Sequence, residues 1–533
     1  MAKDYLPVDR DQAFLLPPDM RDWLPEGHAV WLVIDAVRLM DTSAFHARRK
    51  KGGAGAAGFD PDMLVTLLVW AYANGVTSSR RIEALCGQDL AFMVICAGRA
   101  PDHVTVARFR QQFAEAAAPF FAQVLVLCAR LGMGRVGVVA IDGTKIAASA
   151  SRDANRSEEG LRRLAAEMAA AHADADGRED ALFGEGRRAD DDPGDPGTRE
   201  RRVAAALADM EAEREAAEAA ERAAADESVA RARAGSPKGG RGPAAAEVAL
   251  AEERVARETA AYQAKVAARE AAAAAGRPRS GGPPVPVQDY CRVREAREAL
   301  ARARARAQAG GAAKSKKEKR RERAQRNVTD PDSRLMPVRG GGFLQGYNPQ
   351  NVTTADGLVI ATRLTNSPAD AQWYEPMIAE ATAAAAMMAA AGAPGTGKIG
   401  LALADAGYLS HANLTRPGPD RLIATGKRRD LDRAARAAAR GDAPDPDGAA
   451  GGPAAAMAAR LATPDGIAAY RRRGHIGETF HGDLKHNMGI RRLTVRGLPK
   501  ASGEWTFATA VRNLRKAITS GHLTTAALAA LPA

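Results

Sequence analysis

Apolar residues in the first part of the chain recur every three or four positions, in segments separated by Gly, Pro and Ser. This spacing places apolar side chains on one face of a helix. Helices are predicted to begin near Phe59, Ser78 and Asp102. We therefore expect residues 1–130 to form an all-α N-terminal domain.

Several arginines of this domain fall close to the predicted helix starts. They are Arg80, Arg81, Arg108 and Arg110. A small helical unit with cations in these places is typical of a helix-turn-helix that reads duplex DNA. A plain helical bundle with solvated arginines is the alternative interpretation.

The composition changes to Ala, Glu and Arg between residues 153 and 328. Helical blocks are expected at 158–173, 198–234, 244–275 and 293–307, separated by joints rich in Gly and Pro. Their faces are mostly alanine, so each block buries little apolar area. We expect an insertion of loosely packed antiparallel helices, partly disordered. The basic run 314–323 fits either a phosphate contact or a solvated helix.

Strand patterns frame this insertion. The apolar runs 136–141 and 399–404 each end at an aspartate, Asp142 or Asp405. Asp356-Gly357 separates two further strand patterns and predicts a hairpin. A helix over 373–391 and a short strand over 421–425 are also expected. A low-complexity loop at about 430–462 should then precede a polar helix that Glu478 opens.

This order of elements predicts an α/β fold of the RNase H-like kind, a mixed sheet with flanking helices. Residues 131–152 would supply its first strand and residues 329–533 the remainder, with the insertion 153–328 between them. Such folds place ligand sites at strand ends. Two of the three carboxylates noted above fall there.

Charge and cysteine content narrow the partner and the compartment. The chain has 533 residues, a formal net charge of +12 and a pI near 9.7. That balance favours a polyanion such as nucleic acid, although codon bias toward Arg and Ala is an alternative. The four cysteines lack zinc-site spacing. No signal-peptide pattern is present, and the run 63–73 is too short to span a bilayer, so a cytoplasmic protein without a membrane partner is expected.

The three carboxylates suit a site for hard divalent cations. Two Mg²⁺ ions about 3.5 to 4 Å apart activate a nucleophile and stabilise the leaving oxygen in phosphodiester chemistry. Oxygen ligands without sulfur are what Mg²⁺ or Mn²⁺ prefers. Asp142, Asp405 and Glu478 are therefore candidate metal ligands. Taken singly, an aspartate after an apolar run is more often a turn or helix cap.

Cations and an aromatic residue surround Glu478 along the chain. Tyr470 and Arg473 precede it, and Lys485 follows seven positions later, which on an α-helix is the same face. Arg491, Arg492 and Arg496 extend the positive segment. These residues are candidate DNA contacts, and a solvated polar face is the alternative.

In combination these segments resemble bacterial insertion-sequence transposases of the DDE class, in the group with a Tyr-Arg-Glu-Lys signature. The resemblance is carried by Pro101-Asp-His-Val-Thr-Val-Ala-Arg-Phe-Arg, Ala140-Ile-Asp-Gly-Thr-Lys, Thr329-Asp-Pro-Asp-Ser-Arg, Gln345-Gly-Tyr-Asn-Pro-Gln, Ala404-Asp-Ala-Gly-Tyr, the stretch 470–492, Arg496-Gly-Leu and Gly503-Glu-Trp. It implies that Asp142, Asp405 and Glu478 are catalytic metal ligands for two Mg²⁺ ions. It also implies that Tyr470, Arg473 and Lys485 support the DNA phosphate.

The resemblance further implies binding of double-stranded DNA at terminal inverted repeats, cleavage there, and strand transfer to target DNA. A homodimer that pairs two ends, located in the cytoplasm with the nucleoid, would follow. Gly477 and Thr479 beside Glu478 depart from the group's pattern, and so does the long insertion. Two alternatives stay open: an inactive DNA-binding relic that acts as a repressor, and an RNase H-like nuclease without strand transfer.

Overall fold

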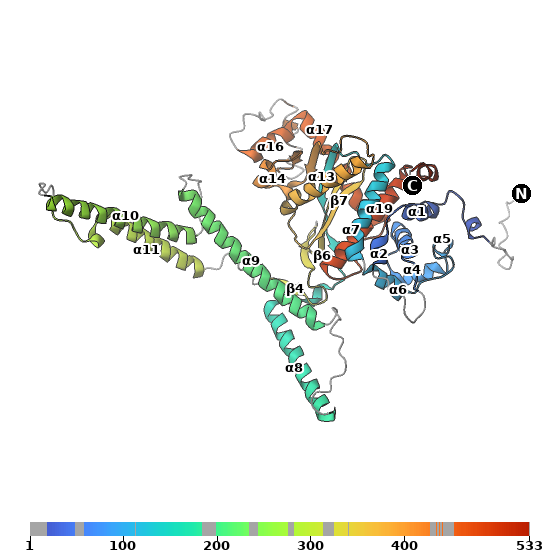
Figure 1. Cartoon of the computed structure of the whole chain (residues 1–533), viewed down its shortest axis with the longest axis horizontal. Coiled ribbons are helices and arrows are strands. Elements are labelled where there is room, and N and C mark those ends of the chain that lie inside the picture. Colours follow the sequence, from blue (N-terminus) through green and yellow to red (C-terminus); the bar gives the residue numbers. More distant parts are fainter. Residues whose placement is uncertain are drawn as a thin grey trace. The chain divides into compact units, whose positions relative to one another are not determined.

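The computed structural model describes residues 19–47, 58–111, 113–183, 199–233, 244–275, 282–312, 324–338, 340–426 and 452–531, with isolated residues between the last two ranges (Figure 1). The chain divides into two compact units. The first combines Met1–Ala154 with Thr329–Ala533, and the second is Asn155–Val328. The second unit starts two residues after the predicted insertion and ends with it. The basic run 314–323 lies outside the described residues.

The N-terminal segment is helical. Its helices are η1 (Met20–Trp23), α1 (Ala29–Arg38), α2 (Ser43–His46), α3 (Pro61–Ala73), α4 (Ser79–Cys86), α5 (Leu90–Ile95), α6 (His103–Arg110) and α7 (Phe113–Arg130). Asp60, Ser78 and Asp102 cap α3, α4 and α6 through their side chains, so the three predicted starts are confirmed. Arg108 and Arg110 lie in the last turn of α6, so their predicted place near a helix start was wrong.

A mixed sheet forms the centre of the first unit. Its strands are β1 (Val138–Gly143), β2 (Ile146–Ala147), β5 (Arg334–Pro337), β6 (Phe343–Thr354), β7 (Val359–Thr365), β8 (Leu401–Ala404) and β9 (Asp420–Ile423). β1 runs parallel to β8, and β8 parallel to β9, whereas β6 is antiparallel to β1 and β7. The predicted β6–β7 hairpin is confirmed, and Gly357 at its turn has a φ of +83°.

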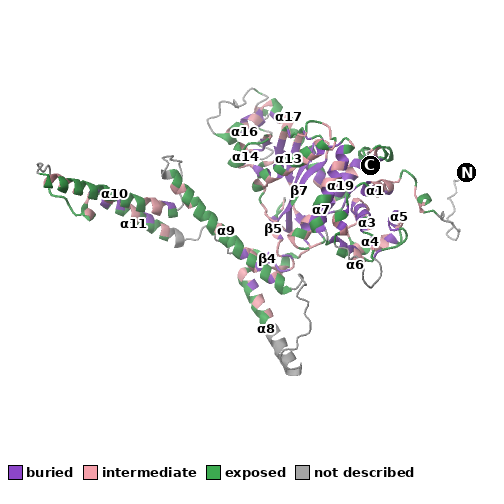
Figure 2. Ribbon diagram, in the orientation of Figure 1, coloured by how far each residue is buried: buried purple, intermediate pink, exposed green. Residues whose placement is uncertain are grey.

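Helices from both ends of the chain pack on this sheet. α7 lies along α19 (Leu498–Thr519), and α13 (Tyr374–Ala390) contacts β7 and α7. Gly503 of α19 meets the α7 backbone, and the rings of Phe113 and Phe507 stack with centroids 4.2 Å apart. Buried residues concentrate in this region (Figure 2). The N-terminal helices and the sheet therefore share one hydrophobic core.

One described helix, α7, is long and apolar enough to cross a membrane by length and composition. Ten of its residues are buried, among them Phe120, Val124 and Cys128. They belong to the hydrophobic core that also contains residues of α19. The apolar character of α7 is thus accounted for by its place in this core.

The region before Glu478 differs from the prediction. Residues 453–462 form helix α16 (Pro453–Ala462) rather than a loop, because Pro at the first turn and an alanine-rich sequence favour a helix, and Met457 and Leu461 are buried. The rest of the predicted loop lies almost wholly outside the described residues. α17 (Pro464–Arg473) begins at the cap Thr463 and runs into a π-helical turn, η6 (Gly474–Glu478). Glu478 is therefore inside a helical segment and does not open one.

The segment continues through α18 (Thr479–Gly482) and a second π-helical turn, η7 (Asp483–Asn487). π-helical turns are rare in proteins, and those that occur often lie at functional sites. The remaining short elements of the first unit are η2 (Arg152–Ala154), η4 (Ala371–Trp373), η5 (Ala406–Tyr408), α14 (His411–Thr415) and α20 (Thr525–Ala529).

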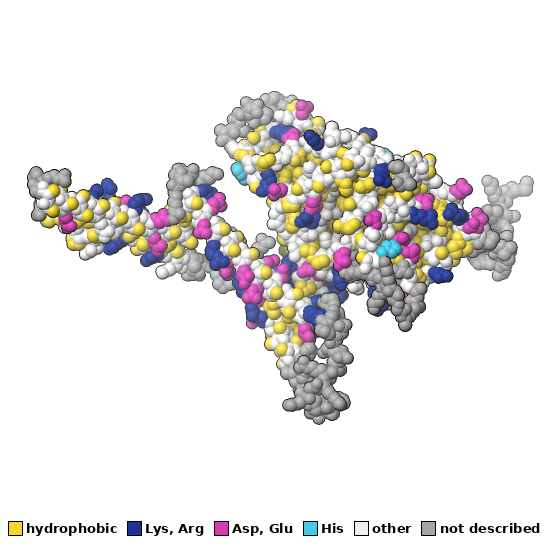
Figure 3. All heavy atoms as spheres, viewed as in Figure 1, with side chains coloured by type: hydrophobic (Ala, Val, Ile, Leu, Met, Phe, Trp, Pro, Cys, Tyr) yellow, Lys and Arg dark blue, Asp and Glu magenta, His cyan; other side chains and the backbone are white. Residues whose placement is uncertain are grey.

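The second unit is a helical insertion. It comprises β3 (Asn155–Ser157), α8 (Glu158–Phe183), α9 (Arg199–Arg233), α10 (Ala244–Ala274), η3 (Val287–Asp289), α11 (Cys291–Ala312) and β4 (Gln325–Asn327), with β3 paired to β4. Ion pairs Arg304–Glu252 and Arg306–Glu247 show that α10 and α11 run antiparallel, as predicted. Acidic and basic side chains are interspersed along these helices (Figure 3). The predicted disorder concerns joints that lie almost entirely outside the described residues.

Candidate active site

The two aspartates are brought together by strand register. β1 and β8 are parallel neighbours with Ile141 opposite Ala404, so Asp142 and Asp405 are the next pair along the two strands. Adjacent strands lie about 4.8 Å apart, which places the two residues side by side at the same end of the sheet. Asp405 also caps η5 by accepting from the Gly407 amide at 2.9 Å. The two strands follow from the apolar runs that the sequence contains, and the register is set by the sheet.

Glu478 reaches the same place from the η6 turn. Gly477 lies against β1, since a Cβ on this glycine would stand 3.2 Å from the Cβ of Asp142. That distance is tighter than most real contacts, so a larger residue would push the helix away from Asp142. The departure of Gly477 from the family pattern therefore has a physical reason in this chain.

Arg473 lies between two of the carboxylates. Its guanidinium is 3.4 Å from Asp142 Oδ1 and 3.2 Å from Glu478 Oε1. Burial raises the pKa of Asp142 to about 7, the charge of Arg473 opposes that rise, and Asp405 and Glu478 add to it. Three carboxylates thus influence one another at this site, and the cations Arg473, Lys485 and Lys145 lie close to them.

The donor set fits a divalent metal ion. All three residues offer carboxylate oxygens, which Mg²⁺ and Mn²⁺ prefer, and the Glu478 side chain is 58% exposed, so the site is open on one side. The three carboxylates are not yet close enough together to hold one ion. Among the described residues, their ligand atoms do not all lie within 4.8 Å of one another. Glu478 is paired to Arg473 instead, so holding an ion requires this pair to open.

Another group of potential metal ligands is close enough together, but it lies away from this site. His46, Asp60 and Asp62 bring their ligand atoms within 4.8 Å at the start of α3. Asp62 already accepts from Thr42 at 2.5 Å and lies 2.8 Å from His46, and Asp60 caps the helix. The cap made by Asp60 and the bonds of Asp62 to Thr42 and His46 therefore account for the cluster without an ion.

The other predicted site residues divide into two groups. Tyr470 donates to the Ala404 carbonyl at 3.2 Å, and Lys485 donates to Thr144 Oγ1 at 2.5 Å and to the Lys145 carbonyl at 3.0 Å. Both therefore touch the strand ends that carry the aspartates. Burial lowers the pKa of Lys485, and the charge of Asp142 opposes this. The second group, Arg108, Arg491, Arg492 and Arg496, is exposed, and Arg110 is buried.

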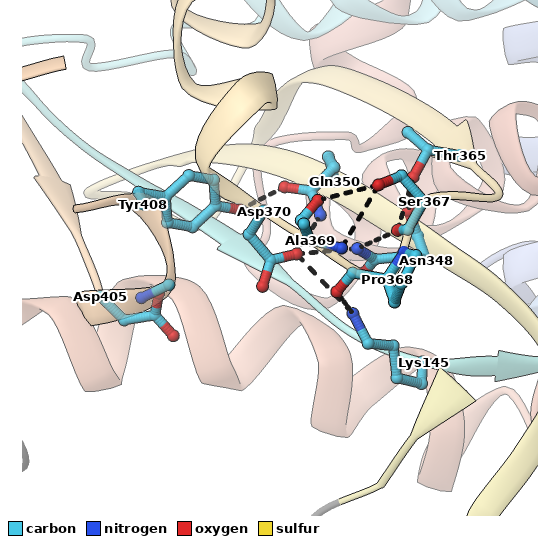
Figure 4. A network of polar contacts seen from close by, with 11 residues as sticks. Lys145, Asn348, Gln350, Thr365, Ser367, Pro368, Ala369, Asp370, Asp405 and Tyr408 are labelled. Carbon is cyan, nitrogen blue, oxygen red and sulfur yellow. Dashed lines mark hydrogen bonds and ion pairs between the residues drawn. The ribbon is translucent and has the colours of Figure 1, made fainter. Parts of the chain in front are cut away.

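Sequence reasoning missed a polar network beside Asp405. Asp370 Oδ1 accepts from Asn348 at 2.7 Å and from Gln350 at 2.8 Å, and Lys145 Nζ lies 3.7 Å away. The Tyr408 hydroxyl donates to Gln350. Figure 4 shows these side chains gathered around Asp370, with Asp405 beside them.

This network lies next to the second aspartate. A Cβ on Gly407 would lie 3.0 Å from both Asp370 Oδ2 and Asp405 Oδ1, so both carboxylates face the same glycine. The sequence held one signal: Asn348 and Gln350 are two apart on a strand and so share a face. Nothing local marks Asp370, which follows the end of β7.

His481 is the second residue that was missed. Its Nε2 lies 3.6 Å from Asp142 Oδ2, and neither ring nitrogen has a hydrogen-bond partner among the described residues. Burial lowers the pKa of His481 to about 3, with Lys485, Arg512 and Arg473 contributing, so the ring is neutral. Its spacing from the other histidines gave no hint of this neighbour.

The fold and the site define a mixed α/β protein with an acidic centre at the ends of parallel strands. Two family models match the chain: "Transposase domain (DUF772)" over residues 18–112 and "Transposase DDE domain" over residues 449–518. The two matches together cover less than half of the chain, and both support a DDE-type insertion-sequence transposase. The second match contains Glu478, Arg473 and Lys485, whereas Asp142 and Asp405 lie outside both, so their assignment rests on strand register. No curated protein and no solved structure matches the chain.

Proposed function

We propose that this transposase belongs to the Tyr-Arg-Glu-Lys group and uses Asp142, Asp405 and Glu478 to cut DNA at terminal inverted repeats and to transfer the ends to target DNA. The single observation that carries the proposal is the register of β1 and β8, which sets two aspartates side by side under Glu478. The mixed sheet that produces this register supports an RNase H-like core.

Each side chain of the site has a separate task. Asp142, Asp405 and Glu478 would together hold the metal ions through their carboxylate oxygens. Bound Mg²⁺, with Mn²⁺ as a substitute, supplies charge neutralisation at the attacking and leaving oxygens. Arg473 leaves its carboxylate partners and turns to the DNA phosphate. Lys485, fixed on the backbone next to Asp142, holds a phosphate oxygen.

The partners and location follow from the same assignment. Double-stranded DNA, both the inverted repeats and the target, would contact the exposed cations Arg108, Arg491, Arg492 and Arg496. A homodimer would pair two element ends, and the protein would work in the cytoplasm on the nucleoid. The net charge of +12 supports a polyanionic partner.

The test combines cleavage and joining. A labelled duplex carrying the DNA that flanks the gene is incubated with the purified protein in Mg²⁺, in Mn²⁺ or in EDTA, with an unlabelled plasmid as target. Metal-dependent cleavage at a defined end, followed by joining to the plasmid, is the expected result. Cleavage without joining would identify a nuclease, and binding without cleavage in any metal would identify a relic; either result refutes the proposal.

A further inference from the structure

A basic groove lies between the N-terminal helices and the segment that follows Glu478. Its volume is about 730 Å³, and it is bounded by α4, α6 and residues 489–500. Its cationic side chains are Arg110, Arg491, Arg492, Arg496 and Lys500. None of the described residues that line it is acidic. The groove therefore concentrates positive charge in a concave place, which attracts anions.

Arg110 makes the groove unusual for a surface feature. The residue is only 4% exposed, and its Nε and Nη2 have no hydrogen-bond partner among the described residues. Its Nη1 donates to Thr494 at 3.4 Å, and its guanidinium lies 5.5 Å from the ring centroid of Tyr72. Leaving buried charged donors unpaired costs free energy. An anion in the groove would offset part of this positive charge.

Hydroxyl groups and a helix end add to the anion character. Thr77, Ser78 and Ser79 line the groove at the start of α4, where the helix dipole is positive. Ser149 and Thr494 add polar atoms on the opposite wall. Cations, hydroxyls and a helix N-terminus together are the donors that phosphate oxygens accept from.

Two chain segments join the groove to the carboxylate site. Arg491 Nε donates to the Lys485 carbonyl at 3.1 Å, and Arg496 Nε donates to the Ser149 carbonyl at 3.1 Å. The backbone of Ala147 is bonded to Arg491 and Leu493. Residues 142–149 and 485–496 thus run beside each other from the carboxylates to the groove.

The length of these segments limits how far the groove can lie from the carboxylates. Ser149 lies seven positions after Asp142, and a fully extended chain of that length spans at most about 25 Å. One strand of B-DNA rises about 3.4 Å per nucleotide, so that span corresponds to about seven nucleotides.

We propose that the groove binds a backbone phosphate of the DNA within about seven nucleotides of the phosphodiester that is cut. This site is separate from the metal centre and works without metal. It rests on the proposed function, because the cut position is defined by the element end. The groove contains helices of the N-terminal segment and residues of the catalytic segment, so one phosphate would hold both to the same DNA.

The test replaces single phosphates by neutral methylphosphonates across the ten nucleotides on each side of the element end. Binding of each duplex is measured in EDTA by gel shift, for the unmodified protein and for Arg492→Ala, an exposed groove residue. Arg130→Ala, an exposed arginine at the end of α7, is the matched control. We expect one or two positions within about seven nucleotides to weaken binding roughly five- to tenfold, since each removes a charged contact.

At those positions the Arg492→Ala protein should show a smaller loss, because its contact is already absent. Its salt dependence should also fall by about one phosphate contact, whereas Arg130→Ala should match the unmodified protein. The proposed phosphate site would be refuted if no methylphosphonate position weakened binding. It would also be refuted if Arg492→Ala lost as much binding at the sensitive positions as the unmodified protein. Failure to cut in Mg²⁺ with the profile intact would overturn the proposed function and leave the groove standing.

Discussion

Replacing Gly503 by alanine should separate α19 from α7. A Cβ on this residue would stand 2.3 Å from the Phe113 carbonyl oxygen, 2.4 Å from its carbon and 2.6 Å from the Ala114 nitrogen. All three are backbone atoms of α7, so no side chain can turn away to make room. The two helices must move apart, and the stacked pair Phe113–Phe507 moves with them.

The cost can be placed on a scale. Overpacking a tight contact costs about 1 to 3 kcal/mol, and a rigid backbone neighbour puts this case at about 3 kcal/mol. The first unit contains roughly 360 residues, and at about 2.1 cal/mol/K of unfolding entropy per residue a loss of that size lowers Tm by about 4 °C.

The assay is thermal unfolding followed by circular dichroism. Gly482→Ala serves as the matched control, because a Cβ there meets nothing within 4 Å. The control should leave Tm unchanged or raise it slightly, since alanine favours a helix. A Gly503→Ala protein that melts within 1 °C of the unmodified chain would refute the close approach of α7 and α19.

Two further changes probe the charges near the site. Asp483 bonds Arg512 at 3.1 Å and Arg515 at 2.6 Å, and although burial raises its pKa, Asn487 and these arginines lower it overall. Asp483→Asn should therefore cost about 2 to 4 kcal/mol in urea unfolding at pH 7. The loss should shrink as the pH falls below 3.8 and become small below the lowered folded-state pKa, because the carboxyl is then protonated in both states. Equal losses at both pH values would contradict this account. Arg473→Gln removes the cation that pairs with the carboxylates, so the Tm of the metal-free protein should fall. The rise in Tm on adding Mn²⁺ should be larger than for the unmodified protein. An equal rise would show that Arg473 does not compete with the ion.

Much of the fold was predictable because strands and caps leave local signals. The apolar runs before Asp142 and Asp405, the Asp356-Gly357 turn and three N-caps each gave the element found. The helix α16 was missed because an alanine-rich, low-complexity sequence resembles a linker. It becomes a helix here because its few large apolar residues, such as Met457, pack against the sheet and its neighbours.

Only those features of the site that depend on nearby residues in the sequence could be predicted. Parallel strands that end in aspartates place Asp142 and Asp405 together, whichever helix covers them. The approach of Glu478 depends on the absence of a side chain at Gly477 and on a π-helical turn, neither of which local pattern indicates. Asp370 reaches the site by tertiary packing alone, so no spacing in the sequence could identify it.

The measurement that tests the central claim most directly compares Asp405→Asn with Asp465→Asn. The second is the same chemical change at an exposed position in the first turn of α17. Both proteins are assayed for Mg²⁺-dependent cleavage at the element end, and for binding of the same duplex in EDTA. The account predicts that Asp405→Asn binds normally and loses cleavage by at least about a thousandfold, while Asp465→Asn keeps both activities. Cleavage by Asp405→Asn at the unmodified rate would contradict it.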